Sequence, residues 1–220
     1  MRIFNSDPIN FNSHNLKVRR ADKIMRNTMN QAPVISTSRV LNYLCVQKNP
    51  TLKQKCQTKN KLLQQTRFDY KNIEEVYQGT LKTQVANCLE MAKITALAFL
   101  ANGYTNLRIA KIDLLTNFRF SSGREENIRE RIDHAMLVVE DENSELIVDP
   151  WLGFVEDLSN GLTRYDGVFM QGFRKAENVL GKMKQEFILR DVYEVNPDNK
   201  SSEYFTEKYP ELVCNFTRFI

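Results

Sequence analysis

The stretch Asn87-Cys88-Leu89-Glu90-Met91-Ala92 joins a polar loop to an apolar pattern with helical spacing that runs to residue 102. The following Asn102-Gly103 pair predicts the end of that helix. A cysteine at the start of a helix lies at the positive end of the helix dipole, which favours the thiolate over the thiol. Because the thiolate is the nucleophilic form, Cys88 is the candidate nucleophile.

A β-hairpin is predicted between residues 135 and 149. Two runs of β-forming residues, 135–139 and 146–149, flank an acidic turn that contains Asn143. Pro150 then ends the second strand, where its missing N–H is tolerated best. This is the clearest hairpin signal in the chain.

The hairpin register predicts the partners of the nucleophile. With the turn centred near residues 142 and 143, Asp149 lies opposite Met136 and diagonal to His134, on the same face of the sheet. Asp149 can then bond one imidazole nitrogen of His134 and leave the other for a thiol. The sequence therefore predicts a catalytic triad of Cys88, His134 and Asp149, with Trp151 shielding the His–Asp bond from water.

The oxyanion of an acyl intermediate needs hydrogen-bond donors near the sulfur. The backbone N–H of Cys88 is one candidate, and the side chains of Gln84 and Asn87 are the others, with Gln84 preferred. Glu90 is interpreted as a first-turn acid that stabilises the helix dipole and points away from the sulfur. Three residues beyond the triad are candidates for a substrate cleft: Tyr165, Asp166 and Phe169.

Composition indicates a folded chain without a metal or another cofactor. Hydrophobic residues make up 42% of the 220 residues, and 31 basic against 27 acidic side chains leave a net charge of +4, too mild to predict nucleic-acid binding. Four cysteines without a CxxC pair and only two histidines predict neither a zinc site nor a disulfide framework. We also expect no signal peptide and no transmembrane segment, since the start lacks an apolar run and no 18-residue apolar stretch exists.

Two regions are predicted along the chain. Residues 1–32 form an N-terminal arm, either a loose and flexible segment or a short amphipathic helix over 18–29. Residues 33–220 form a single domain whose catalytic core covers about 80–155. The predicted fold class is α+β, with an antiparallel sheet of four to six strands, a central nucleophile helix and a helical N-terminal part.

Further elements are expected from local patterns. Residues 38–46 predict a helix, and the Lys/Gln-rich stretch 51–66 predicts a solvated helix or linker. Gly79 reads as a turn, residues 107–115 as a strand, and 118–132 as a loop because that stretch is polar and charged. Towards the C-terminus, 154–188 is expected to be irregular with short helices, 182–193 a strand or a helix, and the aromatic tail partly packed.

Three motifs together resemble a known family. The stretch at 87–92, Asp133-His134-Ala135 with the β run that follows, and Val148-Asp149-Pro150-Trp151 are similar to motifs of papain-like and transglutaminase-like cysteine enzymes. These enzymes occur among the effectors that bacterial pathogens inject into host cells. The resemblance covers about residues 80–155, and Ala86 stands where many relatives have glycine. It implies a nucleophile helix packed against an antiparallel sheet that carries the base and the acid.

The expected function is thiol acyl chemistry on a host protein, through a thioester acyl-enzyme. Water as acceptor makes the chain a protease or glutamine deamidase, and an amine makes it a transglutaminase. The resemblance implies synthesis in a bacterial cytoplasm and action in a host cytosol. One alternative is a catalytically silent module that docks a host protein or an anionic surface. A weaker one is an acetyltransferase with the same triad. The pattern leaves the oligomeric state open.

Overall fold

The computed structural model of the chain describes residues 8–34, 36, 50–69, 72–119, 123–141, 144–169, 182–196 and 198–216. The helices are α1 (Pro8–Gln31), α3 (Pro50–Asp69), α4 (Ile73–Thr83), α5 (Cys88–Ala101), α6 (Leu158–Phe169), α8 (Ser202–Lys208) and the 3-10 helix η1 (Pro210–Leu212). The strands are β1 (Leu107–Arg119), β2 (Glu125–Asp141), β3 (Ser144–Asp149), β4 (Phe154–Asp157) and β5 (Lys182–Glu194). The helix expected over 38–46 lies outside the described residues.

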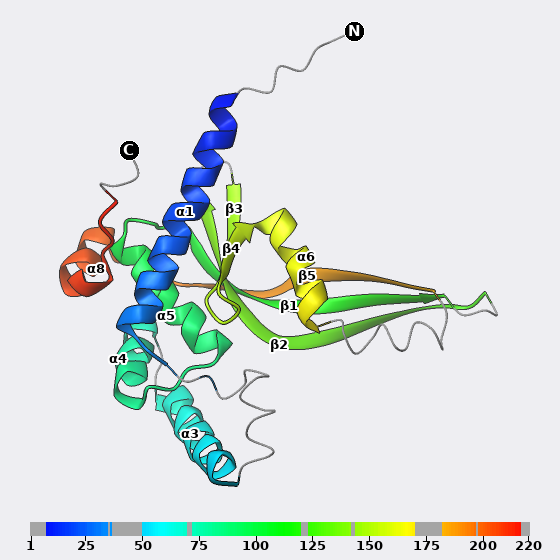
Figure 1. Cartoon of the computed structure of the whole chain (residues 1–220), viewed down its shortest axis with the longest axis horizontal. Helices are drawn as coiled ribbons and strands as arrows, with labels where there is room; N and C mark the ends of the chain where they lie inside the picture. The colour runs from blue at the N-terminus through cyan, green and yellow to red at the C-terminus, as the bar shows by residue number, and fades with distance from the viewer. Residues whose placement is uncertain are drawn as a thin grey trace.

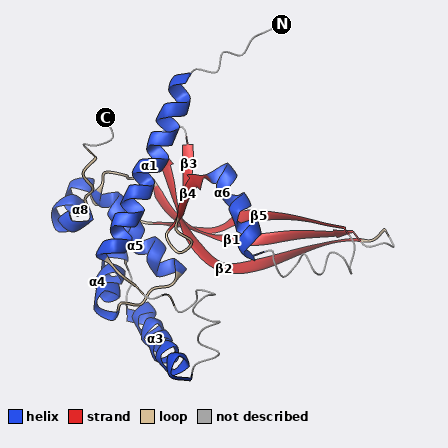
Figure 2. Cartoon of the chain, viewed as in Figure 1, coloured by secondary structure: helices blue, strands red, loops and turns tan. Residues whose placement is uncertain are grey.

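The described strands pair into one antiparallel sheet in the order β4-β3-β2-β1-β5. β2 and β3 form the predicted hairpin, with Asp141 level with Ser144. β1, β2 and β5 continue together beyond the helices (Figure 1), so the sheet has a covered part and a projecting part. The prediction of a mixed chain with helices and an antiparallel sheet is confirmed (Figure 2).

Helix α5 lies in the middle of the main core. Nearly all of its residues are buried, because its sequence is apolar on every side rather than along one stripe. The helix ends at Asn102, whose Nδ2 donates to the carbonyls of Ala98 and Leu212 at 2.7 and 2.9 Å. The next residue, Gly103, has φ 87°, the left-handed conformation expected for a glycine stop.

The two faces of the sheet are covered by different helices. The cluster around α5 includes Ala135 and Leu137 of β2, whereas Met136 and Val138 belong to a second cluster with Tyr165 of α6. Alternate residues of one strand therefore face opposite cores. Gly161 lets α6 approach β3 closely, since a Cβ there would meet Ile147 at 3.0 Å.

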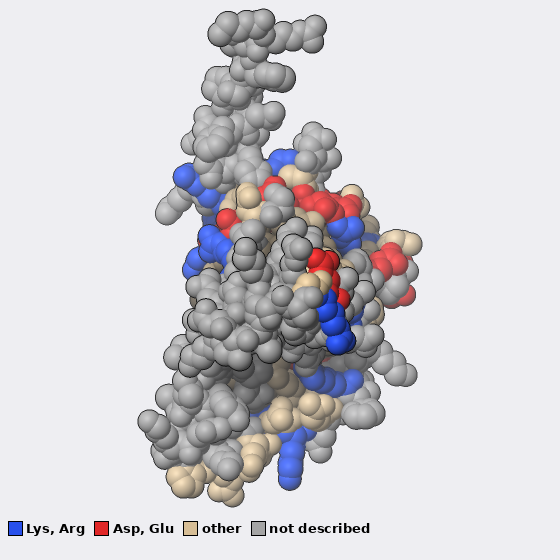
Figure 3. Space-filling model, turned by 90° about the vertical axis from the view of Figure 1, so that its right-hand side faces the viewer, with Lys and Arg blue, Asp and Glu red and all other residues tan. Residues whose placement is uncertain are grey.

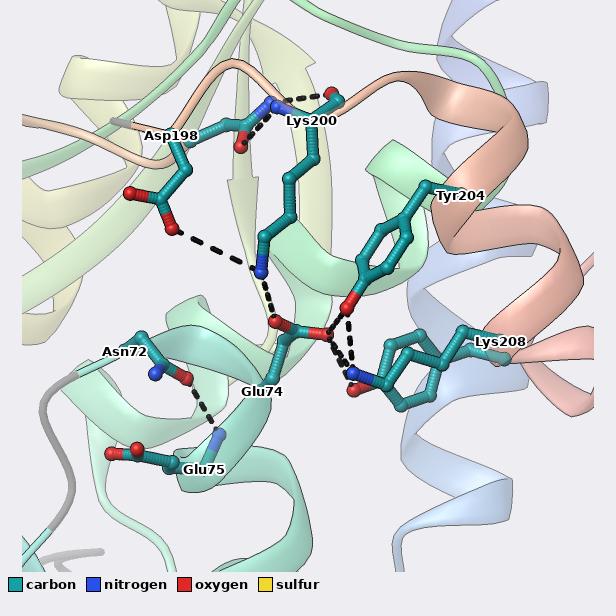
Figure 4. A network of polar contacts seen from close by, with 9 residues as sticks. Asn72, Glu74, Glu75, Asp198, Lys200, Tyr204 and Lys208 are labelled. Atoms are coloured by element: carbon teal, nitrogen blue, oxygen red, sulfur yellow. Dashed lines mark hydrogen bonds and ion pairs between the residues drawn. The ribbon is translucent and has the colours of Figure 1, made fainter.

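The carboxylate of Glu74 in α4 accepts hydrogen bonds from side chains of the C-terminal segment (Figure 4). Oε1 of Glu74 accepts from the hydroxyls of Tyr204 and Tyr209 at 3.0 and 2.9 Å and from Lys208 at 2.8 Å, and Oε2 accepts from Lys200 at 2.6 Å. These donors hold the pKa of Glu74 at about 2, although partial burial alone would raise it. Phe205 and Tyr209 are buried, as expected for a packed tail.

Two local predictions are wrong. The stretch 118–132 was expected to be a loop, but β1 continues to Arg119 and β2 begins at Glu125, with Arg119 paired to Glu125. The backbone ladder sustains these strands beyond the covered core, where alternation of apolar and polar residues is not required. Gly79 was expected to mark a turn, but it is a buried residue inside α4, and the turn comes at Gln84 with φ 55°.

Within the predicted N-terminal arm, residues 8–31 form one long helix, α1, which contributes to the core. Ala21, Ile24, Met25 and Thr28 of α1 are buried on one side, which is the spacing of an amphipathic helix. Residues 50–69 are the helix α3. Across the residues that the structure describes, every helix is too short or too polar to span a bilayer. On the face that Figure 3 shows, described acidic and basic side chains are interspersed.

Candidate functional site

Cys88 is the first residue of α5, and the turn before it is held in place from two sides. Asn87 is the N-cap in an extended conformation, and its N–H donates to Oε2 of Glu90 at 3.0 Å. Arg67 of α3 donates to both oxygens of Glu90, at 2.7 and 3.2 Å. The carboxylate of Glu90 is thus neutralised in an ion pair while it caps the helix.

His134 lies at an irregularity of the sheet. Lys111 pairs with Ala135 and Ile112 with Ile132, so Asp133 and His134 fall between two neighbouring pairs of the β1–β2 ladder. A bulge of this kind redirects a side chain and is common beside functional sites. His134 is the buried base candidate at the point where the regular pairing of β1 and β2 is interrupted.

Asp149 accepts hydrogen bonds on both oxygens. Oδ2 lies 2.5 Å from Nε2 of His134 and accepts the hydroxyl of Tyr165 at 2.8 Å, and Oδ1 accepts the backbone N–H of Leu152 at 2.9 Å. The hairpin register explains the contact with His134, because β3 ends with Asp149 one step beyond the Leu137–Val148 pair. Asp149 and Tyr165 are fully buried, so these bonds are formed away from water.

The other imidazole nitrogen, Nδ1, remains for Cys88, whose side chain is hydrogen-bonded to His134. Cys88 is 9% exposed and His134 is 2% exposed. The structure therefore brings together the three side chains of the predicted triad. Their order, sulfur to imidazole to carboxylate, is that of a nucleophile, a base and an orienting acid.

Trp151 packs against His134 and connects it to the turn that precedes Cys88. Its ring lies 5.2 Å from the imidazole of His134, and its Nε1 donates to Oγ of Ser36 at 3.0 Å. The hydroxyl of Ser36 in turn donates to Oδ1 of Asn87 at 3.2 Å. This chain of contacts fixes the orientation of the Asn87 amide beside Cys88.

Burial lowers the pKa of His134, but hydrogen bonds to Asp149 and Cys88 and the charges of both groups outweigh it and raise the pKa to about 9. The imidazole is accordingly protonated at neutral pH. Burial, followed by the Asp149 carboxylate, raises the pKa of Tyr165, so its hydroxyl stays a donor. The structure therefore places a protonated imidazole between the Asp149 carboxylate and the Cys88 sulfur.

An NMR titration of the imidazole signals tests this charge state. Removing His14 leaves His134 as the only histidine of the chain. We expect its midpoint at about pH 9, and a lower midpoint after Cys88→Ala, because one of the groups that raise the pKa is lost. A midpoint at or below the ordinary value of about 6.5 would contradict the structure.

The raised pKa of His134 also makes the stability of the fold depend on pH. The folded pKa lies above the unfolded one, so the protonated imidazole stabilises the fold fully below about pH 6.5, and this contribution disappears as the pH rises through about 9.

The predicted oxyanion and cleft residues lie at different distances from solvent and from the triad. Asn87 lies beside Cys88 and is oriented by Ser36, whereas Gln84 is an exposed residue that ends α4 in the left-handed conformation. Tyr165, expected to line a substrate cleft, is instead fully buried against Asp149. The side chains of Asp166 and Phe169 lie outside the described residues.

Two supporting residues were not identified from the sequence. Ser36 bridges Trp151 and Asn87, and Arg67 neutralises Glu90. Neither has a local signal, because each acts across more than twenty residues of chain. Within the described residues, no three His, Cys, Asp or Glu side chains are grouped so that they could share a metal ion.

Comparison of the chain with models of protein families finds no matching family. Comparisons with curated proteins and with solved structures also give no match. The function is therefore inferred from the geometry and chemistry of the site.

Proposed function

We propose that the chain is a cysteine enzyme of the papain-like or transglutaminase-like kind, acting on carboxamide or peptide groups of a protein substrate. The observation that supports this best is the buried bond of 2.5 Å between Nε2 of His134 and Oδ2 of Asp149, with Cys88 hydrogen-bonded to the same imidazole. A lone cysteine at a helix start is usually a core residue. One paired with a protonated histidine is placed for nucleophilic attack.

In the proposed reaction, the Cys88 thiolate attacks the carbonyl carbon and forms a C–S bond. The oxyanion is stabilised by the backbone N–H of Cys88, at the first position of α5, with Asn87 or Gln84 as the second donor. The C–N bond then breaks, and His134 donates its proton to the leaving ammonia or amine. The product of this step is a thioester on Cys88.

In the second half, neutral His134 takes a proton from water or from an acceptor amine, which attacks the thioester. The C–S bond breaks, Cys88 leaves as the thiolate, and His134 is again protonated. Asp149 keeps the imidazole in one orientation and stabilises its charged form throughout. Water gives proteolysis or deamidation, and an amine gives cross-linking. The resemblance alone adds that the chain acts as an effector on a host protein.

Alkylation by iodoacetamide, read at each cysteine by mass spectrometry, tests the proposal without a known substrate. Cys214 is a matched internal control, because it is 9% exposed like Cys88, while burial raises the pKa of its thiol. At pH 7 we expect Cys88 to react about tenfold faster than Cys214 or more, and to lose this advantage in His134→Ala.

Equal rates at the two cysteines, or a Cys88 rate that is unaffected by the loss of His134, would overturn the proposal. The chain would then fit a binding module with a buried thiol. If Cys88 is reactive, ammonia release from a glutamine peptide and the appearance of new N-termini distinguish deamidation from proteolysis.

A further inference from the structure

A cavity of about 310 Å³ lies between the nucleophile helix, α4, β1 and the end of β5. Its walls are largely apolar, and Ile73, Leu89, Ile109 and Val195 contribute to them. A cavity of this size suits one or two side chains of a ligand. It is separate from the buried bonds of the triad, since none of the triad side chains lines it.

The cavity is nevertheless lined by residues close to both Cys88 and His134 in the fold. Leu89 directly follows Cys88 in the first turn of α5. Lys111 is paired with Ala135, which directly follows His134. Asp149 ends β3, which pairs with one edge of β2, whereas Ile109 and Lys111 of the cavity belong to β1, which pairs with the other edge.

The charges around the cavity favour an acidic ligand. Lys93 and Lys111 both line it and are half-buried, with Glu194 as the acidic residue of the lining. Within the described part of the chain, the side chain of Lys93 makes no hydrogen bond or ion pair. Its carbon stem can cover apolar surface while its ammonium remains available at the rim. A carboxylate brought by a ligand would give the Lys93 ammonium a partner.

We propose that this cavity is a substrate subsite that takes an apolar side chain next to a carboxylate, as in a peptide segment where a residue such as leucine adjoins an acidic residue. The proposal rests on the proposed function, because it assigns the occupant of the space beside Cys88 and His134. Apolar contact with Leu89 and Ile109 would hold the side chain, and Lys93 and Lys111 would select the acid.

Two alkylating probes separate these contributions: N-iodoacetyl-leucine, with a free carboxylate, and N-iodoacetyl-leucinamide, in which that group is neutral. With each, the Cys88 thiolate displaces iodide and forms a thioether. The rate with the acid is divided by the rate with the amide, which cancels the reactivity of the sulfur. Division by the same ratio for glutathione then cancels the difference in intrinsic reactivity between the two probes. For wild-type protein we expect about fivefold in favour of the acid, a typical effect of two partly exposed ion pairs.

The double variant Lys93→Gln, Lys111→Gln should bring the ratio to that of glutathione. Lys82→Gln, which removes an exposed lysine outside this cavity, should leave the ratio unchanged. Glu194→Gln removes the acidic residue of the lining and should raise the acid-to-amide ratio. Thermal unfolding of each variant shows whether it is folded.

The outcomes distinguish the two proposals. Slow reaction of wild-type Cys88 with iodoacetamide would overturn the proposed function and the subsite with it. Fast reaction with iodoacetamide, but an acid-to-amide ratio equal to that of glutathione, would overturn the subsite alone. A raised ratio that survives loss of both lysines would also overturn the subsite, because the preference would then arise elsewhere.

Discussion

The Asp149→Asn variant is expected to lose turnover by on the order of a thousandfold while keeping its fold. Asparagine has nearly the same shape as aspartate but carries no charge. Burial would then lower the pKa of His134 with less to oppose it, and the imidazole would be neutral at pH 7. A neutral imidazole neither stabilises the Cys88 thiolate nor donates a proton to the leaving group.

Cys88 alkylation at pH 7 measures this effect before a substrate is known. Each unit by which the pKa of His134 falls lowers the equilibrium constant of the thiolate–imidazolium pair by about tenfold. We therefore expect the alkylation rate of Cys88 to decrease at least about tenfold. Cys214 serves as the control in the same sample and should be unchanged. An unaltered Cys88 rate in a folded Asp149→Asn protein would show that the carboxylate does not act on the imidazole.

Tyr165→Phe provides a graded comparison. It removes the hydroxyl that donates to Oδ2 of Asp149 at 2.8 Å but leaves the carboxylate and the aromatic packing against His134. We expect a smaller decrease in Cys88 alkylation than for Asp149→Asn, because the charge of Asp149 remains.

The second large effect concerns stability. Glu74→Gln is expected to lower the free energy of unfolding by on the order of 2 kcal/mol at pH 7, because a carboxylate with four donors is replaced by an amide that is itself partly a donor. The buried hydroxyl of Tyr209 and the ammonium of Lys200 lose their charged acceptor. Chemical denaturation measures the change, and Glu75→Gln, an exposed carboxylate next in the helix, is the matched control.

The stabilisation by the Glu74 carboxylate should decrease as the pH falls. The folded pKa of Glu74, about 2, lies below its ordinary value of about 4.5, so the carboxylate stabilises the fold fully above about pH 4.5. That contribution disappears as the pH falls from 4.5 through 2. The difference between wild type and Glu74→Gln should therefore shrink over this range. A difference that stays constant down to pH 2 would show that the network does not depend on ionised Glu74.

Much of the candidate site could be predicted because its signals are local. The change from loop to apolar helix at Cys88 predicts the first position of α5, and the hairpin turn predicts the register that places Asp149 near His134. Side-chain alternation in strands is strict, so a correct turn predicts which residues share a face. The long continuation of β1 and β2 could not be predicted from the sequence, because backbone pairing outside the core needs no apolar alternation.

Local signals in the sequence were sufficient to predict the start of α5 and the β2–β3 hairpin, and hence the proximity of His134 and Asp149, because helix caps and tight turns act within a few residues. Only the folded chain shows that Tyr165 donates to Asp149, that Ser36 joins Trp151 to Asn87, and that Lys93 and Lys111 line one cavity. These contacts join segments far apart in the chain. They form where helices and loops pack against the sheet, which no local pattern encodes.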